Sequence, residues 1–111
     1  MNYTILYYND KVQAEINAMP LNIRAKYAAF TLRMQTVGAY LGEPHTKAFG
    51  DGLFELRLKS NEGIGRVFYC TMIGQRIVML HSFIKKTQKT PSHELALAKE
   101  RLKKVKQNVN T

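Results

Sequence analysis

The stretch Leu53-Phe54-Glu55-Leu56-Arg57-Leu58-Lys59 decides the fold class of this chain. Apolar and charged residues alternate along it, and a period of two predicts a β-strand with one buried and one polar face. Gly50-Asp51-Gly52 before it and Asn61-Glu62-Gly63 after it predict turns at both ends. The sequence therefore predicts a strand whose charged side chains share one face.

Two further strands follow this one. Ile64–Ile73 is an apolar run, and Arg76–Ile84 is another. Gly74-Gln75 between them predicts a two-residue hairpin loop of type II′, because glycine is preferred at its first position. Three consecutive strands joined by short turns predict an antiparallel meander.

The residues before the meander predict one strand and two helices. Tyr3–Tyr8 is rich in strand-forming residues. Asn9 or Asp10 can cap a helix that ends before Pro20. A second helix is expected from Asn22 to Val37, with Gly38 as its stop. Its apolar stripe follows a 4-3-4-3 spacing: Ile23, Tyr27, Phe30, Met34 and Val37.

The last predicted element is a basic helix. Thr90 can cap it, and Pro91 suits its first position. Its narrow apolar seam comprises Leu95, Ala98, Leu102 and Val105. The order is strand, two helices, three or four strands, helix. We therefore expect a single α+β domain over residues 1–111, in which the N-terminal strand and helical hairpin pack on an antiparallel sheet.

Positive charge is concentrated near the C-terminus. The formal net charge is +9, and residues 81–111 hold eight of the 17 Lys and Arg but only two of the eight Asp and Glu. A clustered basic surface indicates a polyanion or an acidic partner. The alternative is that the lysines only solvate the last helix.

The single cysteine, Cys70, cannot form an intrachain disulfide, which suits the cytoplasm. No signal peptide or membrane-spanning stretch is expected. The three histidines lie far apart in the sequence, and no paired zinc-ligand motif occurs. We therefore expect no metal and no cofactor.

Candidate catalytic residues are cations on the strands. His81 and Lys85 alternate with Phe83, so these side chains project from one face. Arg57 and Arg66 could converge with them if the strands pair in meander order, although alternation leaves open whether Arg57 shares that face. Lys86 continues the cluster into the following loop. Arg57, Arg66, His81, Lys85 and Lys86 are the expected catalytic residues.

This set of residues suits phosphate chemistry. Ribonuclease cleavage needs a base for the 2′-hydroxyl, cations for the phosphoryl oxygens and an acid for the leaving 5′-oxygen. Arginine binds phosphate bidentately, and a lysine among cations has a lowered pKa and can act as a base. We expect RNA contacts from Lys59, Tyr69, Lys89, Lys103 and Lys104. The alternatives are that the cations line an outer face or bind an acidic partner, and that Tyr69 packs in the core.

Three segments resemble the RelE/ParE toxin superfamily, in its phage-derived HigB-like branch. They are Gly52-Leu53-Phe54-Glu55-Leu56-Arg57, Gly65-Arg66-Val67-Phe68-Tyr69, and the run from His81 to Pro91. The resemblance implies a compact α+β toxin that cleaves mRNA on the ribosome without a metal. It also implies neutralisation by an antitoxin, often a HigA-like protein with a helix-turn-helix domain, through which alone the toxin would reach operator DNA.

Two other functions remain open from the sequence. One is a ParE-like inhibitor of DNA gyrase, because fold and basic charge are shared across the superfamily. The other is a non-toxic, phage-derived nucleic-acid-binding module. His81 and the Lys85–Lys86 pair favour the nuclease. Well-known members of the superfamily carry a tyrosine or an aspartate near the C-terminus, and here the chain after Val105 has neither, so the roles of base and acid stay unassigned.

Overall fold

The computed structural model describes residues 2–85 and 90–109. Its elements are β1 (Thr4–Tyr7), α1 (Asp10–Asn17), α2 (Leu21–Val37), β2 (Thr46–Gly50), β3 (Leu53–Ser60), β4 (Gly63–Met72), β5 (Arg76–Lys85) and α3 (Ser92–Val109). The predicted α+β class and the order of elements are confirmed. The loop residues before the predicted meander form β2, which is its fourth strand.

The sheet is mixed rather than wholly antiparallel. Its strand order is β1-β5-β4-β3-β2. The pairs β2–β3, β3–β4 and β4–β5 are antiparallel. β1 instead pairs parallel with β5, with Ile5 opposite Ile77. A parallel pair needs a long crossover connection, and here both α1 and α2 lie between the two strands in the sequence. The sequence pattern carried no signal for this pairing.

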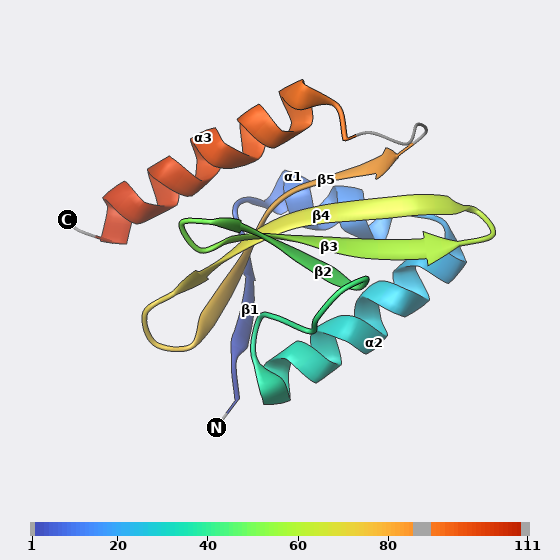
Figure 1. Cartoon of the computed structure of the whole chain (residues 1–111), viewed down its shortest axis with the longest axis horizontal. Helices are drawn as coiled ribbons and strands as arrows, with labels where there is room; N and C mark the ends of the chain where they lie inside the picture. Colours follow the sequence, from blue (N-terminus) through green and yellow to red (C-terminus); the bar gives the residue numbers. More distant parts are fainter. Residues whose placement is uncertain (1, 86–89, 110–111) are drawn as a thin grey trace.

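Helices cover both faces of the sheet, α1 and α2 on one and α3 on the other (Figure 1). The core under α1 and α2 includes Ile16, Ile23, Leu56 and Met79. A second, smaller core lies under α3. Its buried members are Leu53, Phe68, Cys70, Val78, Leu80, Ala98 and Leu102. None of the helices in the described ranges is both long and apolar enough to cross a bilayer.

Local signals place the helices much as expected. The Asn9 side chain accepts a hydrogen bond from the Val12 backbone N–H at 2.9 Å, so Asn9 is the N-cap of α1. The predicted stripe of α2 is wrong at its last position, because Val37 is 65% exposed. The buried face instead runs through Thr31 to Met34 and ends there.

Glycine is needed at two positions, at Gly65 because a side chain would not fit and at Gly74 because of the backbone conformation. Gly65 lies where α2 crosses β4, and a Cβ there would be only 2.6 Å from Cγ2 of Ile23. Gly74 and Gln75 both have positive φ, 85° and 58°. A type II′ turn has positive φ only at its first central residue, so the predicted turn type is wrong.

Candidate functional site

Strand register brings the predicted cations onto one face of the sheet. Arg57 lies directly opposite Arg66, and Arg66 lies opposite Phe83. Lys59 and Lys85 both lie opposite Ile64, from the two neighbouring strands. Directly paired residues point to the same side of a sheet. We call this set the cationic cluster: Arg57, Lys59, Arg66 and Lys85. It occupies the face that α3 partly covers, beyond the end of the small apolar core.

A buried carboxylate holds the two arginines together. Glu55 is 1% exposed and accepts a hydrogen bond from Nη1 of Arg66 at 2.7 Å and one from Nε of Arg57 at 3.3 Å. The hydroxyl of Thr90, just before α3, donates to its other oxygen at 3.3 Å. Burying a carboxylate is unfavourable unless it is paired, and both arginines meet that need. Glu55 therefore fixes the guanidinium positions.

Arg66 has donor capacity that the protein leaves unused. The residue is only 7% exposed, yet its Nε has no hydrogen-bond partner among the described residues. Buried donors are nearly always satisfied, and each exception calls for an explanation such as a missing ligand. Guanidinium groups match the geometry of phosphate oxygens. Its unsatisfied Nε makes Arg66 a candidate for contact with an anion.

The surroundings of Lys85 change its acid–base chemistry. Burial lowers the pKa of its amine below the usual 10.5, and the nearby positive charges of Arg66, Arg57 and Lys47 lower it further. Glu55 opposes these effects. A lowered pKa increases the fraction of neutral amine near neutral pH. A larger fraction of Lys85 than of a surface lysine is therefore in the neutral form, which is the form that can accept a proton.

His81 is held by the C-terminal helix. Its Nε2 lies 3.0 Å from Oε1 of Glu94 on α3, and its ring stacks on Phe83 with a centroid distance of 5.9 Å. The side chains of His81 and Glu94 are only 12% and 16% exposed. His81 thus lies on the face of the cationic cluster, next to Phe83, with its orientation fixed by Glu94.

Comparison with known proteins identifies the family of the chain. The profile described as "Phage derived protein Gp49-like (DUF891)" matches residues 14–103. This chain belongs to the Gp49-like family. A solved structure of a double arginine-to-alanine mutant of E. coli toxin RelE in the free state aligns with a TM-score of 0.58. The alignment covers 91% of this chain and 98% of that chain, with 11% identity.

The family and the fold agree with the expected resemblance to the RelE superfamily. At 11% identity, the likeness to RelE shows a shared fold. None of the curated proteins compared with this Gp49-like chain matches it in sequence.

The prediction that Tyr69 contacts RNA is wrong. Tyr69 is 0% exposed and lies in the core under α1 and α2, on the face opposite the cationic cluster. Its hydroxyl donates to the carbonyl of Ala39, and burial raises its pKa. Tyr69 therefore packs the core, the alternative that the sequence left open.

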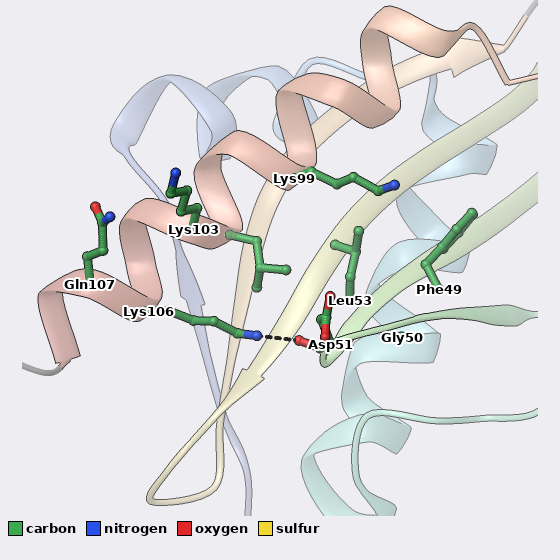
Figure 2. Close-up of a pocket in the computed structure, with 9 residues that line it drawn as sticks. Phe49, Gly50, Asp51, Leu53, Lys99, Lys103, Lys106 and Gln107 are labelled. Carbon is green, nitrogen blue, oxygen red and sulfur yellow. Dashed lines mark hydrogen bonds between the residues drawn. The ribbon is translucent and has the colours of Figure 1, made fainter.

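The predicted lysines of α3 lie apart from the cluster. Lys103 lines a cavity of about 410 Å³ between α3 and the β2–β3 turn, near Leu53 (Figure 2). There Lys106 donates a hydrogen bond to the carbonyl of Asp51, while Lys103 points away from the turn. A strand rises about 3.3 Å per residue, so Arg57 lies about 13 Å along β3 from Leu53. This distance separates the cavity at α3 from the cationic cluster.

Lys104 is exposed and pairs with Glu100 one helical turn away, at 3.5 Å. Two other predicted site residues, Lys86 and Lys89, lie outside the described residues.

Within the described part of the chain, no three His, Cys, Asp or Glu side chains cluster as a metal site. Burial raises the pKa of the Cys70 thiol to about 11, which leaves it protonated and unreactive.

Sequence reasoning missed two charged residues of the site. Glu55 was placed on the polar face of its strand, beside Arg57, but its role as shared counterion was not foreseen. Lys47 lies opposite Glu55 on β2, with its amine 5.2 Å from the centre of the Phe49 ring. The alternation in β3 could have suggested Glu55. Lys47 carried no such signal, because β2 is short and its ladder is irregular at Gly50.

Proposed function

We propose that this Gp49-like protein is the toxin of a type II toxin–antitoxin system, of the HigB-like branch, and cleaves mRNA on the ribosome in the cytoplasm. One observation carries the proposal. Arg66 is buried on the sheet face that it shares with Arg57 and Lys85, and its Nε has no hydrogen-bond partner within residues 2–85 and 90–109. A fixed pair of guanidiniums beside a lysine of lowered pKa suits the cleavage of a phosphodiester.

The chemistry can proceed without a redox or metal step. The neutral amine of Lys85 takes the proton of a ribose 2′-hydroxyl. The 2′-oxygen then bonds to phosphorus, and the bond from phosphorus to the 5′-oxygen breaks. Arg57 and Arg66 stabilise the charge on the phosphoryl oxygens. The 5′-oxygen takes a proton from an acid, for which His81 is the described candidate; Lys86 stays a candidate outside the described residues. The products are a 2′,3′-cyclic phosphate and a 5′-hydroxyl.

The test is to map mRNA 5′ ends after brief induction of the protein in bacteria. The wild type should stop translation and produce new 5′ ends, whereas Arg57→Ala and Arg66→Ala should do neither. Arg33→Ala is the matched control, because Arg33 is exposed on α2. Each variant is checked for folding by circular dichroism. Unchanged toxicity in both site variants would refute the proposed site.

The same experiment separates the other functions. DNA damage with intact mRNA would indicate a ParE-like gyrase inhibitor. Growth without any defect would indicate a non-toxic nucleic-acid-binding module. Both outcomes would contradict the nuclease.

The proposed partner is an antitoxin with a helix-turn-helix domain, similar to HigA, and operator DNA would be reached only through it. The +9 charge of the chain favours an acidic partner surface. Co-expression with the neighbouring open reading frame should restore growth and yield a complex on purification. If no neighbouring product restores growth, the proposed pairing is wrong.

A further inference from the structure

A cavity lies at the free edge of β3, beside the cationic cluster. β2 pairs with β3 only from Leu53 to Leu56, and the last contact is the hydrogen bond from the Arg57 N–H to the His45 carbonyl. Beyond this point a cavity of about 350 Å³ opens, which we call the edge cavity. Its lining residues are Lys26, Phe30, Pro44, His45, Arg57, Lys59, Ile64 and Arg66.

Both cationic and aromatic residues line the edge cavity. Four of its residues are Lys or Arg, and none is Asp or Glu. The rings of Phe30 and His45 pack against each other with centroids 4.8 Å apart. An unpaired nucleotide carries a flat base and a phosphate, so it matches both kinds of residue in this lining. The volume lies near the lower end of the roughly 300–1,000 Å³ typical of ligand pockets.

The edge cavity is continuous with the proposed cleavage site. Arg57 and Arg66 belong to both. The Nε of Arg66 has no hydrogen-bond partner among the described residues. A nucleotide in the cavity would therefore sit next to the phosphate that the two arginines hold. Positions adjacent to a cut phosphate are where a nuclease can read bases.

We propose that the edge cavity binds one unpaired nucleotide of the substrate RNA, adjacent to the bond that is cut. Its base lies against Phe30 and His45, and its phosphate faces Lys26 and Arg57. This inference rests on the proposed function and adds to it a base-contacting subsite built from α2 and the loop before β2.

The experiment measures binding of a short single-stranded RNA that cannot be cleaved, because all its sugars are 2′-O-methyl. A 2-aminopurine base in the RNA loses fluorescence when it stacks on an aromatic ring. Wild-type protein should bind it with quenching. Phe30→Leu should abolish the quenching and weaken binding about tenfold or more. Phe30→Tyr should restore both.

Matched controls come from outside the edge cavity. Tyr40 is 52% exposed and does not line it, so Tyr40→Leu should bind and quench as wild type. Lys26→Gln should weaken binding and lower the slope of log affinity against log salt by about one. Lys11→Gln, on the exposed side of α1, should change neither. Thermal melting of each variant confirms that it is folded.

The outcomes separate this inference from the proposed function. Quenched binding by wild type without mRNA cleavage in cells would leave the edge cavity supported and the nuclease refuted. Normal cleavage, with Phe30→Leu and Tyr40→Leu binding and quenching alike, would overturn the edge cavity and leave the nuclease intact. Displacement of the RNA by a glutamate-rich peptide, with no quenching at any stage, would also overturn it and indicate an acidic protein segment instead.

Discussion

The face of the sheet under α3 has two ends that differ sharply in character. At one end, Leu53, Cys70 and Val78 pack against Leu102 of α3. At the other end, the same strands bury Arg66 against Glu55, and one donor of Arg66 has no partner in the part of the chain that the structure describes. Apolar packing would stabilise the second end as well as the first, and often better than an ion pair does. The buried charge at the second end is what the proposed binding of RNA phosphate would require.

The largest effect is expected from Glu55→Gln. This change removes the shared counterion of Arg57 and Arg66 and should lower the free energy of unfolding by about 3–5 kcal/mol, the usual effect of breaking a buried ion pair. Urea unfolding measures it. Leu102→Ala at the apolar end should destabilise by about 2–5 kcal/mol. Only Glu55→Gln should also lower cleavage per folded molecule. Equal cleavage by both variants would erase the distinction between the two ends.

Arg57→Ala should lower the rate of mRNA cleavage on purified ribosomes about 10²- to 10³-fold, as expected when one donor to the transition state is removed. Its free energy of unfolding should change by at most about 1 kcal/mol, because the Arg57 side chain is 27% exposed and Glu55 still pairs with Arg66. Lys99→Ala, in the cavity at the apolar end, is the control and should cleave as wild type. A comparable loss in Lys99→Ala would move the site towards α3.

Gly65→Ala should lower the free energy of unfolding by about 1–3 kcal/mol, because its methyl group would overlap Cγ2 of Ile23. Thermal or urea unfolding measures the change. The double variant Gly65→Ala with Ile23→Ala should lose less unfolding free energy than the sum of the two single variants, because removing the Ile23 side chain relieves the clash. Strictly additive losses would show that α2 does not press on β4 at this point.

The rate of cleavage should depend on pH through Lys85. Its pKa is lowered by burial and by Arg66, so the neutral amine becomes more abundant as pH rises towards that pKa, and the rate should rise with it. Lys85→Arg stays protonated, so its residual rate should lack this rise. Single-turnover rates from pH 6 to 9 provide the measurement. The same slope in both proteins would assign the base to another group.

Lys104→Gln should have the smallest effect. Its exposed pair with Glu100 contributes about 0.3–0.5 kcal/mol to stability. If Lys104 contacts RNA phosphate, binding should weaken equally for all RNA sequences, and the slope of log affinity against log salt should be lower by about one. An unchanged salt slope would remove Lys104 from the proposed RNA surface.

Much of the fold was predictable from local patterns. The alternation of Leu53–Lys59 predicted β3 and its polar face, and Asn9 was among the expected caps. The parallel pairing of β1 with β5 was not predictable, because it depends on strands about 70 residues apart. The exposure of Val37 was missed because a stripe gives no information on where the neighbouring sheet ends.

By itself, the sequence determined which side chains share a face within each strand, because that alternation is a property of the local backbone. It thereby predicted that His81 and Lys85 point the same way, as the register shows. Only the tertiary structure decided that Arg57 and Arg66 meet over Glu55, and that α1 and α2 bury the face of β4 that carries Tyr69. Those relations depend on the register between strands and on which helices cover each face of the sheet, which sequence spacing does not encode.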